Sequence, residues 1–236
     1  MSDVNEPFVY KFGVEVPHGV IFVIVHPSVK ILPNRLFRRR LQLKKVTLPE
    51  GLEEIGAHAF AFCASLERIN YPSTLNKIGN GAFMHCRSLK EVTPQEGIEE
   101  IGKYAFAFCK SLVHINYPST LIKICKGAFV GCQSLKEVTL LEGLEEIGED
   151  AFPGCISLVH INYPSTLIKI GLNAFRACKS LVHINYPSTL IKIGDGAFMK
   201  CHSLKEVQLL EGLEEIGDNA FENCISLERI NYPSTL

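Results

Sequence analysis

The sequence of 236 residues lacks long apolar segments. Its longest apolar run is the short stretch Gly19–Val25, about a third of the length that a membrane-spanning helix requires. The first residues contain no basic stretch followed by an apolar core, so we expect no secretory signal peptide. Tryptophan is absent. The sequence therefore predicts no membrane span and leaves the location open.

An excess of charge of one sign is also lacking. The chain has 24 Lys and Arg residues against 25 Asp and Glu residues, a formal net charge of −1. A nearly neutral chain has no general attraction for nucleic acid or for an anionic membrane, so neither is an expected partner. With 47% hydrophobic and 21% charged residues, the composition is that of a folded protein rather than a disordered one.

The motifs of common enzymes are missing as well. No H-E-x-x-H, G-x-S-x-G or P-loop pattern occurs. The stretches "GNGAFM" and "GDGAFM" begin like a dinucleotide fingerprint, but they lack its last glycine and its βαβ context. We therefore expect no enzyme, no catalytic residue and no cofactor.

What the sequence does contain is a repeat of fixed length. Phenylalanine recurs at an interval of 23 residues, at Phe60, Phe83, Phe106, Phe129, Phe152, Phe175, Phe198 and Phe221. An alanine precedes each of these residues and a cysteine follows three positions later. The unit reads L-x-x-I-x-(L/Y)-P-x-x-L-x-x-I-G-x-x-A-F-x-x-C-x-S. A fixed period without insertions is typical of a solenoid in which each unit forms one coil.

Each unit divides into three predicted elements. "LVHINYP" and its counterpart "LKEVTLL" have the β-branched and aromatic residues of a strand, and "LIKIG" or "LEEIG" predicts a second short strand. The "xxAFxxC" segment is long enough for a one-turn helix, and Asn173, Asp195 and Asn219 suit the start of such a helix. Parallel strands of successive coils should pair about 4.8 Å apart.

The "IGxxAFxxCxSL" signature, repeated every 23 residues, resembles the BspA-type leucine-rich repeats. The resemblance covers Val29 to Leu236, and the opening segment resembles the lead-in of unicellular-algal members. It implies a right-handed, β-rich leucine-rich-repeat array with parallel strands, one-turn helices and about nine coils. It also implies binding of proteins or surfaces, and it supplies no catalytic residue.

Two regions follow from this reading. Residues 1–28 are predicted to form an N-terminal hairpin that caps the stack, with its turn at Pro17–Gly19. Residues 29–236 are predicted to form the solenoid, whose last unit is incomplete and has no C-terminal cap. One column of the second strand is expected to alternate in charge except where two lysines meet: Glu54, Lys77, Glu100, Lys123, Glu146, Lys169, Lys192 and Glu215.

The cysteine column raises the question of a metal site. Metal ligands usually occur in close sets such as C-x-x-C, and this chain has none, so we expect no metal and a column of buried, reduced thiols. Free thiols fit a reducing compartment and favour a cytoplasmic location. Cys125 replaces glycine in another column. Either that position does not require a positive φ, or the coil around Cys125 is strained.

The first strand supplies the predicted binding face. If its polarity is that of leucine-rich repeats, polar side chains point outward in two columns. These residues are Arg68, Asn70, His114, Asn116, Glu137, His160, Asn162, His183, Asn185, Glu206 and Arg229. A ladder of His and Glu could bind a metal ion or sense pH, but parallel side chains do not converge on an ion, so a solvated face is the simpler interpretation.

A basic cluster lies near the start of the repeats and consists of Arg35, Arg38, Arg39, Arg40, Lys44 and Lys45. It could meet phosphate or an acidic partner, and its simpler interpretation is a soluble face of the cap.

Two classes of function remain. The first is a non-catalytic scaffold that binds an unidentified protein or glycan along one face. The second is a purely structural array that self-assembles through its ends. The open last coil predicts a homodimer formed tail to tail through Tyr232 and Leu236.

Overall fold

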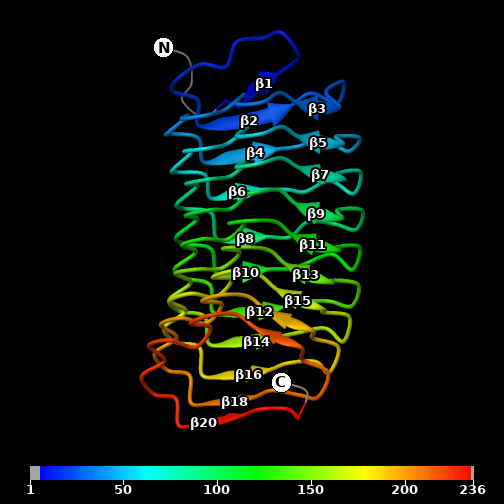
Figure 1. Ribbon diagram of the computed structural model, residues 1–236. Helices are drawn as coiled ribbons and strands as arrows, with labels where there is room; N and C mark the ends of the chain where they lie inside the picture. The colour runs from blue at the N-terminus through cyan, green and yellow to red at the C-terminus, as the bar shows by residue number, and fades with distance from the viewer. Residues whose placement is uncertain (1–5, 235–236) are drawn as a thin grey trace.

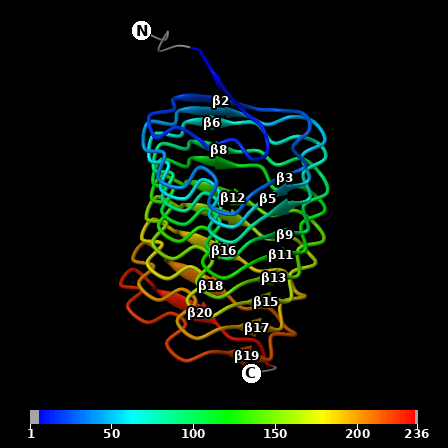
Figure 2. The ribbon, with the colours of Figure 1, turned by 90° about the horizontal axis from the view of Figure 1, so that it is seen from above.

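The computed structural model describes residues 6–234 and shows an elongated stack of coils with two files of short strands (Figures 1 and 2). The first file contains β1 (Phe8–Tyr10), β2 (Phe22–Val25), β4 (Lys45–Thr47), β6 (Arg68–Ile69), β8 (Glu91–Val92), β10 (His114–Ile115), β12 (Glu137–Thr139), β14 (His160–Asn162), β16 (His183–Asn185), β18 (Glu206–Gln208) and β20 (Arg229–Asn231). The second file contains β3 (Ile31–Leu32), β5 (Glu54–Ile55), β7 (Lys77–Ile78), β9 (Glu100–Ile101), β11 (Lys123–Ile124), β13 (Glu146–Ile147), β15 (Lys169–Ile170), β17 (Lys192–Ile193) and β19 (Glu215–Ile216).

All pairings between neighbouring strands are parallel, as the repeat predicts. The second file is one continuous sheet of nine strands, in which Lys123 lies opposite Glu100 on one side and Glu146 on the other. The first file is divided into the sets β1-β2-β4-β6, β8-β10, β12-β14 and β16-β18-β20. The predicted solenoid of parallel strands with about nine coils is confirmed.

The predicted one-turn helices are wrong: in residues 6–234 the "xxAFxxC" segments form turns. The backbone N–H groups of these turns alternate between bonds within their own coil and bonds to the next coil. The Ala59 N–H donates to the Gly56 carbonyl at 3.1 Å, whereas the Phe60 N–H donates to the Ala82 carbonyl of the next coil at 2.7 Å. His58 and Phe62 have left-handed φ values of 55° and 65°. Left-handed residues four positions apart prevent a continuous helical ladder, so the turns bond from coil to coil instead.

The predicted N-terminal hairpin is also wrong, because β1 pairs with β2 in the parallel sense. Phe8 lies opposite Val23, and the His26 N–H donates to the Tyr10 carbonyl at 2.9 Å. The segment between the strands is long enough to circle back and enter β2 in the same direction, which a tight turn at Pro17–Gly19 would not allow. The lead-in is thus a shortened first coil. The boundary at residue 28 stays a prediction.

Phenylalanine rings fill the interior of the stack. Rings of neighbouring coils stack with centroids 5.1 to 5.6 Å apart, from the Phe37–Phe60 pair to the Phe198–Phe221 pair. From Phe37 to Phe198 these side chains are fully buried. A ring buried on both faces by its neighbours contributes a large apolar area, so this column is a main source of stability.

The cysteine column is buried, as predicted, and none of the nine cysteines, all within the described residues, is joined in a disulfide. Each thiol of the column also has a hydrogen-bond acceptor. Cys63 Sγ donates to the Phe37 carbonyl at 2.9 Å, and the same bond recurs through Cys224 Sγ and the Phe198 carbonyl at 3.2 Å. The thiols therefore join neighbouring coils in addition to filling space.

The glycine column that Cys125 interrupts has no left-handed φ values, so the first of the two alternatives for this position is correct. Its glycines lie where neighbouring backbones approach closely. A Cβ atom at Gly148 would lie 2.6 Å from the Ile124 carbonyl oxygen, and one at Gly171 would lie 2.7 Å from the Glu149 nitrogen. The Cys125 N–H donates to the Ile101 carbonyl at 3.2 Å, so the thiol side chain fits without breaking the ladder.

Candidate binding surfaces

The predicted binding face lies on the outer side of the first file. Strand alternation turns Ile115 and Ile161 inward and leaves His114 and His160 exposed. The exposed residues include all those predicted for the face: Arg68, Asn70, His114, Asn116, Glu137, His160, Asn162, His183, Asn185, Glu206 and Arg229. The structure thus gathers them on one side of the molecule, in the strands from β6 to β20 or immediately after them (Figure 1).

Neighbours on this face alternate in chemistry. Glu137 lies opposite His160 in the β12–β14 pair, and His183 lies opposite Glu206 in the β16–β18 pair. Arg229 Nη2 forms an ion pair with Glu206 Oε1 at 2.9 Å. Asn70 differs from the other asparagines, because its side-chain amide donates to the Leu48 carbonyl at 2.8 Å and its oxygen accepts from the Leu48 N–H at 2.7 Å.

A hollow of about 210 Å³ opens on this face between β14 and β16. Its polar lining residues are Glu137, His160, Asn162, His183 and Asn185. The two strands belong to identical stretches of sequence, and they are not paired as a ladder, since this is one of the interruptions of the first file. Amide, imidazole and carboxylate groups therefore surround a break in the sheet.

No metal centre is assembled on this face or elsewhere in the described part of the chain. Among residues 6–234, no group of three or more His, Cys, Asp and Glu side chains is placed to hold an ion. On the predicted face the reason is geometric, because side chains of one parallel ladder point in the same direction.

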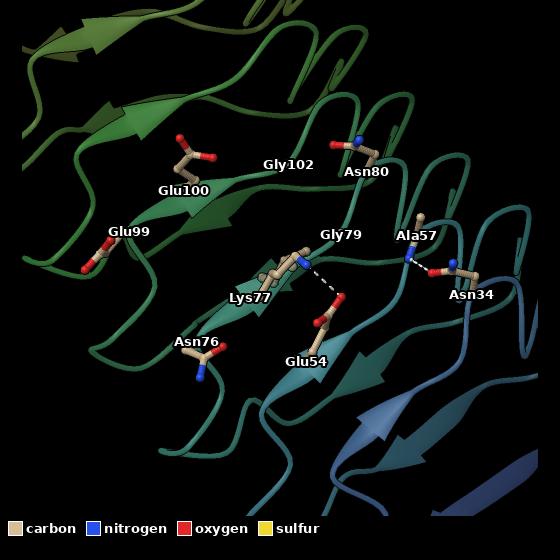
Figure 3. Close-up of a pocket in the computed structure, with 11 residues that line it drawn as sticks. Asn34, Glu54, Ala57, Asn76, Lys77, Gly79, Asn80, Glu99, Glu100 and Gly102 are labelled. Atoms are coloured by element: carbon tan, nitrogen blue, oxygen red, sulfur yellow. Dashed lines mark hydrogen bonds and ion pairs between the residues drawn. The ribbon is translucent and has the colours of Figure 1, made fainter. Parts of the chain in front are cut away.

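A second, larger hollow of about 530 Å³ lies over the second file near its N-terminal end (Figure 3). Lys77 Nζ forms an ion pair with Glu54 Oε1 at 2.9 Å, and Asn34 Oδ1 accepts a hydrogen bond from the Ala57 N–H at 2.7 Å. Glu99 and Glu100 complete the charged lining. Most of these side chains already form an ion pair or a hydrogen bond with a neighbouring coil. The hollow is therefore an open polar groove without the features of a catalytic site. In the sequence, only the column of alternating charges that contains Glu54, Lys77 and Glu100 indicated this groove.

A third surface, which the sequence did not indicate, lies on the turns. Phe62, His85 and Phe108 come from successive coils and stack face to face, with centroids 4.7 Å apart at both steps. We call these three residues the aromatic ladder. The guanidinium groups of Arg38 and Arg39 lie 5.8 and 5.7 Å from the centroid of the Phe62 ring. The one feature of the sequence that could have indicated this surface is the spacing of 23 residues between Phe62, His85 and Phe108.

Other members of the predicted basic cluster have separate environments. Arg40 Nη2 donates to the Val16 carbonyl at 2.8 Å and so fastens the lead-in to the next coil. Lys45 is an exposed residue of β4 and lies on the first file, away from the turns. The structure therefore splits this cluster among several surfaces.

The predicted association edge lies partly outside the described residues. The Tyr232 side chain is 66% exposed, whereas Leu236 lies beyond residue 234. In the described range, residues 6–234, no helix is suited to crossing a membrane.

Comparison with known proteins places these surfaces in context. The sequence profile of the BspA type leucine rich repeat region (6 copies) matches residues 20–136 and 122–236. The structure is similar to that of the T. pallidum leucine-rich repeat protein, with 30% identity, a TM-score of 0.65, and coverage of 70% of this chain and 79% of that chain.

Two further solved structures share the fold. A leucine-rich cell surface protein of Faecalibacterium prausnitzii has 24% identity and a TM-score of 0.50, with coverage of 92% of this chain and 74% of that chain. The pneumococcal vaccine antigen PcpA has 21% identity and a TM-score of 0.53, with coverage of 88% and 67%. None of the curated proteins compared is significantly similar in sequence.

Proposed function

Because this chain belongs to the BspA-type leucine-rich repeat family, we propose that it binds a protein or glycan partner along the outer face of the first file. Leucine-rich repeat proteins are in general interaction scaffolds rather than enzymes.

The hollow between β14 and β16 carries the proposal. It brings two imidazoles, two amides and a carboxylate to one concave, solvent-open place, where the sheet is interrupted. Such groups donate and accept hydrogen bonds in several directions, which suits the hydroxyl groups of a sugar or the backbone of a peptide.

The repetition of the face also supports a partner with a repeating structure. The pairs His114–Asn116, His160–Asn162 and His183–Asn185 present the same two side chains in the same order, in β14, in β16 and at β10, which Asn116 follows. Coils follow one another at about 4.8 Å. Several weak, equivalent contacts along one linear partner add up to stable binding without any single deep pocket.

The experiment presents the intact chain to a glycan array and to a cross-linking pull-down, and it compares the wild type with the quadruple variant His160→Ala, Asn162→Ala, His183→Ala and Asn185→Ala. We expect the variant to lose at least about 90% of the captured signal. A matched control, Lys169→Ala with Lys192→Ala, changes the second file of the same two coils and should retain the signal. Equal capture by the wild type and the quadruple variant would contradict the proposal.

A further inference from the structure

The aromatic ladder occupies backbone positions that disfavour its residues. Phe62, His85 and Phe108 have left-handed φ values of 65°, 62° and 59°. Residues other than glycine and asparagine rarely adopt this conformation, and its cost must be offset by the surrounding structure. In the same column of other coils, Gly131 and Gly154 adopt φ values of 69° and 72° without that cost, and the non-aromatic residues Arg39, Ala177, Lys200 and Asn223 also have left-handed φ values. The coil therefore folds without an aromatic ring at this position, so the ladder requires another explanation.

The faces of the stacked rings are closed. Phe62 and His85 are inclined by 16°, and His85 and Phe108 by 12°, so each ring covers the next. Arg38 and Arg39 cover the outer face of Phe62. At the other end the Phe108 ring lies over Gly131, where an added Cβ atom would be 2.7 Å from Phe108 Cδ1. Only the ring edges point to solvent, and these edges carry the positive part of the aromatic quadrupole.

Tyr104 extends the same surface by one column. It also has a left-handed φ, of 57°, and its ring lies over the backbone of Gly127 in the next coil. The side chain is 38% exposed, and that of Phe108 is 37% exposed. A phenol hydroxyl, a hydrogen-bond donor, thus lies on the same turns, four residues before Phe108 in the chain.

The charges around the ladder are all of one sign. The turn segments 34–40, 57–63, 80–87 and 103–110 contain no Asp or Glu. Their cations are Arg35, Arg38, Arg39, Arg87, Lys103 and Lys110, together with Arg40, which already donates to the Val16 carbonyl of the lead-in. None of these seven takes part in an ion pair within residues 6–234. Partial burial, and then Arg87 and Lys110, lower the pKa of His85, as expected for a site of positive potential.

We propose that the aromatic ladder, with Tyr104 and the surrounding Arg and Lys residues, binds an acidic segment of a partner protein. Carboxylates of the partner accept hydrogen bonds from the guanidinium groups and meet the positive ring edges, while its apolar side chains pack on the exposed parts of Phe108 and Tyr104. Nucleobases and sugars stack on open ring faces, and the ladder has none to offer. The surface lies on the turns and is separate from the outer face of the first file.

The length of the ladder sets the length of the segment. Two steps of 4.7 Å separate the first and last rings, a span of about 9 Å. An extended chain advances about 3.3 Å per residue, so three residues match the rings and about five reach the flanking cations.

Fluorescence anisotropy tests the proposal with the full chain and three labelled probes: hexaglutamate, hexalysine and hexathymidylate. We expect hexaglutamate to bind at least ten-fold more tightly than hexathymidylate, and hexalysine to give no change. Absence of hexaglutamate binding would overturn the proposal. Tighter binding of hexathymidylate would also overturn it and would point to single-stranded nucleic acid instead.

Variants separate the ladder from diffuse charge attraction. Phe62→Gly with Phe108→Gly removes two rings, leaves every charge in place and puts glycine where its φ is favoured, so folding should be retained. The matched control is Lys200→Gly, which lies in the same column with a φ of 62° and removes a positive charge far from the ladder. We expect at least five-fold weaker hexaglutamate binding for the double glycine variant and no change for the control.

Two results of these variants contradict the proposal. One is wild-type affinity in the double glycine variant, and the other is weaker binding in Lys200→Gly alone. Arg38→Ala with Arg39→Ala gives an independent test that keeps the rings. It should weaken hexaglutamate binding by a similar factor, and unchanged affinity would argue against the proposed site.

Discussion

The buried tyrosines are the polar side chains that the interior accommodates least well. The hydroxyl groups of Tyr71, Tyr117, Tyr163 and Tyr186 are buried and lack a hydrogen-bond partner among residues 6–234. Burial raises the pKa of each well above its usual range, and neighbouring thiols of the cysteine column add to the effect. Leucine occupies the same position in other coils, as at Leu140 and Leu209, so the fold does not need the hydroxyl.

Removal of one such hydroxyl should therefore stabilise the protein. Tyr117→Phe eliminates a buried, unpaired polar group and keeps the ring, and we expect the free energy of unfolding to rise by about 1 kcal/mol. Urea denaturation measures the change. Tyr104→Phe, at an exposed tyrosine, is the control and should stay within about 0.5 kcal/mol of the wild type. A loss of stability in Tyr117→Phe would reveal a hydrogen bond between the hydroxyl and a thiol.

The thiols make stability depend on alkaline pH. Burial raises the pKa of Cys63 and of Cys109 to about 12, from an ordinary value of 9.0. In the unfolded chain the thiols ionise near pH 9, whereas in the folded protein they stay neutral, so the unfolded state gains stability as the pH rises. The contribution is fully present below pH 9 and is lost between pH 9 and about 12.

We expect equal urea midpoints at pH 7 and 8 and a falling midpoint from pH 9 upward. Cys109→Ala should reduce the slope above pH 9, because one titrating group is removed. A midpoint that stays constant to pH 11 would show that the thiols are not shielded from solvent.

At the scale of elements, the spacing of the coils depends on the glycine column beside the second file. Gly148→Ala places a methyl group against the Ile124 carbonyl and should lower the free energy of unfolding by about 1–3 kcal/mol. Cys125→Ala is the matched control, because the same column already accepts a larger side chain there, and its effect should be below about 1.5 kcal/mol. Thermal unfolding measures the stability of both variants. Equal stability would show that the close backbone approach at Gly148 does not limit the spacing of the coils.

The strands were predictable from the sequence and the turns were not. Strand alternation is visible in "HIN" and "EVT", where an inward Ile or Val stands between two outward polar residues. The left-handed φ values of Phe62, His85 and Phe108 cannot be predicted from their residue types. Gly131, at the same position of a later repeat, indicates only that the backbone is flexible there. The "xxAFxxC" segment therefore predicts a helix where the structure has a turn. The segment between β1 and β2 predicts a hairpin, whereas in the structure it circles back as a coil.

The candidate surfaces show the same division. The outward direction of His114, His160 and His183 followed from strand polarity and is seen in the structure, while binding by this face stays a prediction. The aromatic ladder was missed because its exposure depends on turn geometry. Phe60 and Phe62 are two positions apart, yet the first is fully buried and the second is half-buried on the turn.

At the scale of the whole molecule, the sheets differ in continuity. The second file is unbroken and tolerates even the contact of Lys169 with Lys192. Lys169 Nζ turns to Glu146 Oε1 at 3.4 Å, and Lys192 Nζ turns to Glu215 Oε1 at 2.7 Å, so the like charges point apart. The first file lacks ladder pairing at the same junction, between β14 and β16.

Self-association through the C-terminal edge stays a prediction at this scale. The side chains of Tyr232 and Ile225 are 66% and 77% exposed, and exposed apolar side chains can form a two-fold contact. Light scattering over a dilution series should detect a dimer at high concentration, and Tyr232→Glu should shift it to monomer. A wild type that is monomeric throughout would dismiss both the homodimer and the alternative of a structural array joined through its ends.

The interruption between β14 and β16 has a mechanical consequence. Hydrogen bonds between coils run along the axis of the stack, so a force that pulls its ends apart loads every interface in series, and the weakest one yields first. The junction that combines a missing ladder with two lysines in register is expected to open before the others. Each coil of 23 residues that then unravels lengthens the chain by about 75–80 Å, so extension should proceed in even steps that begin in the interior of the rod.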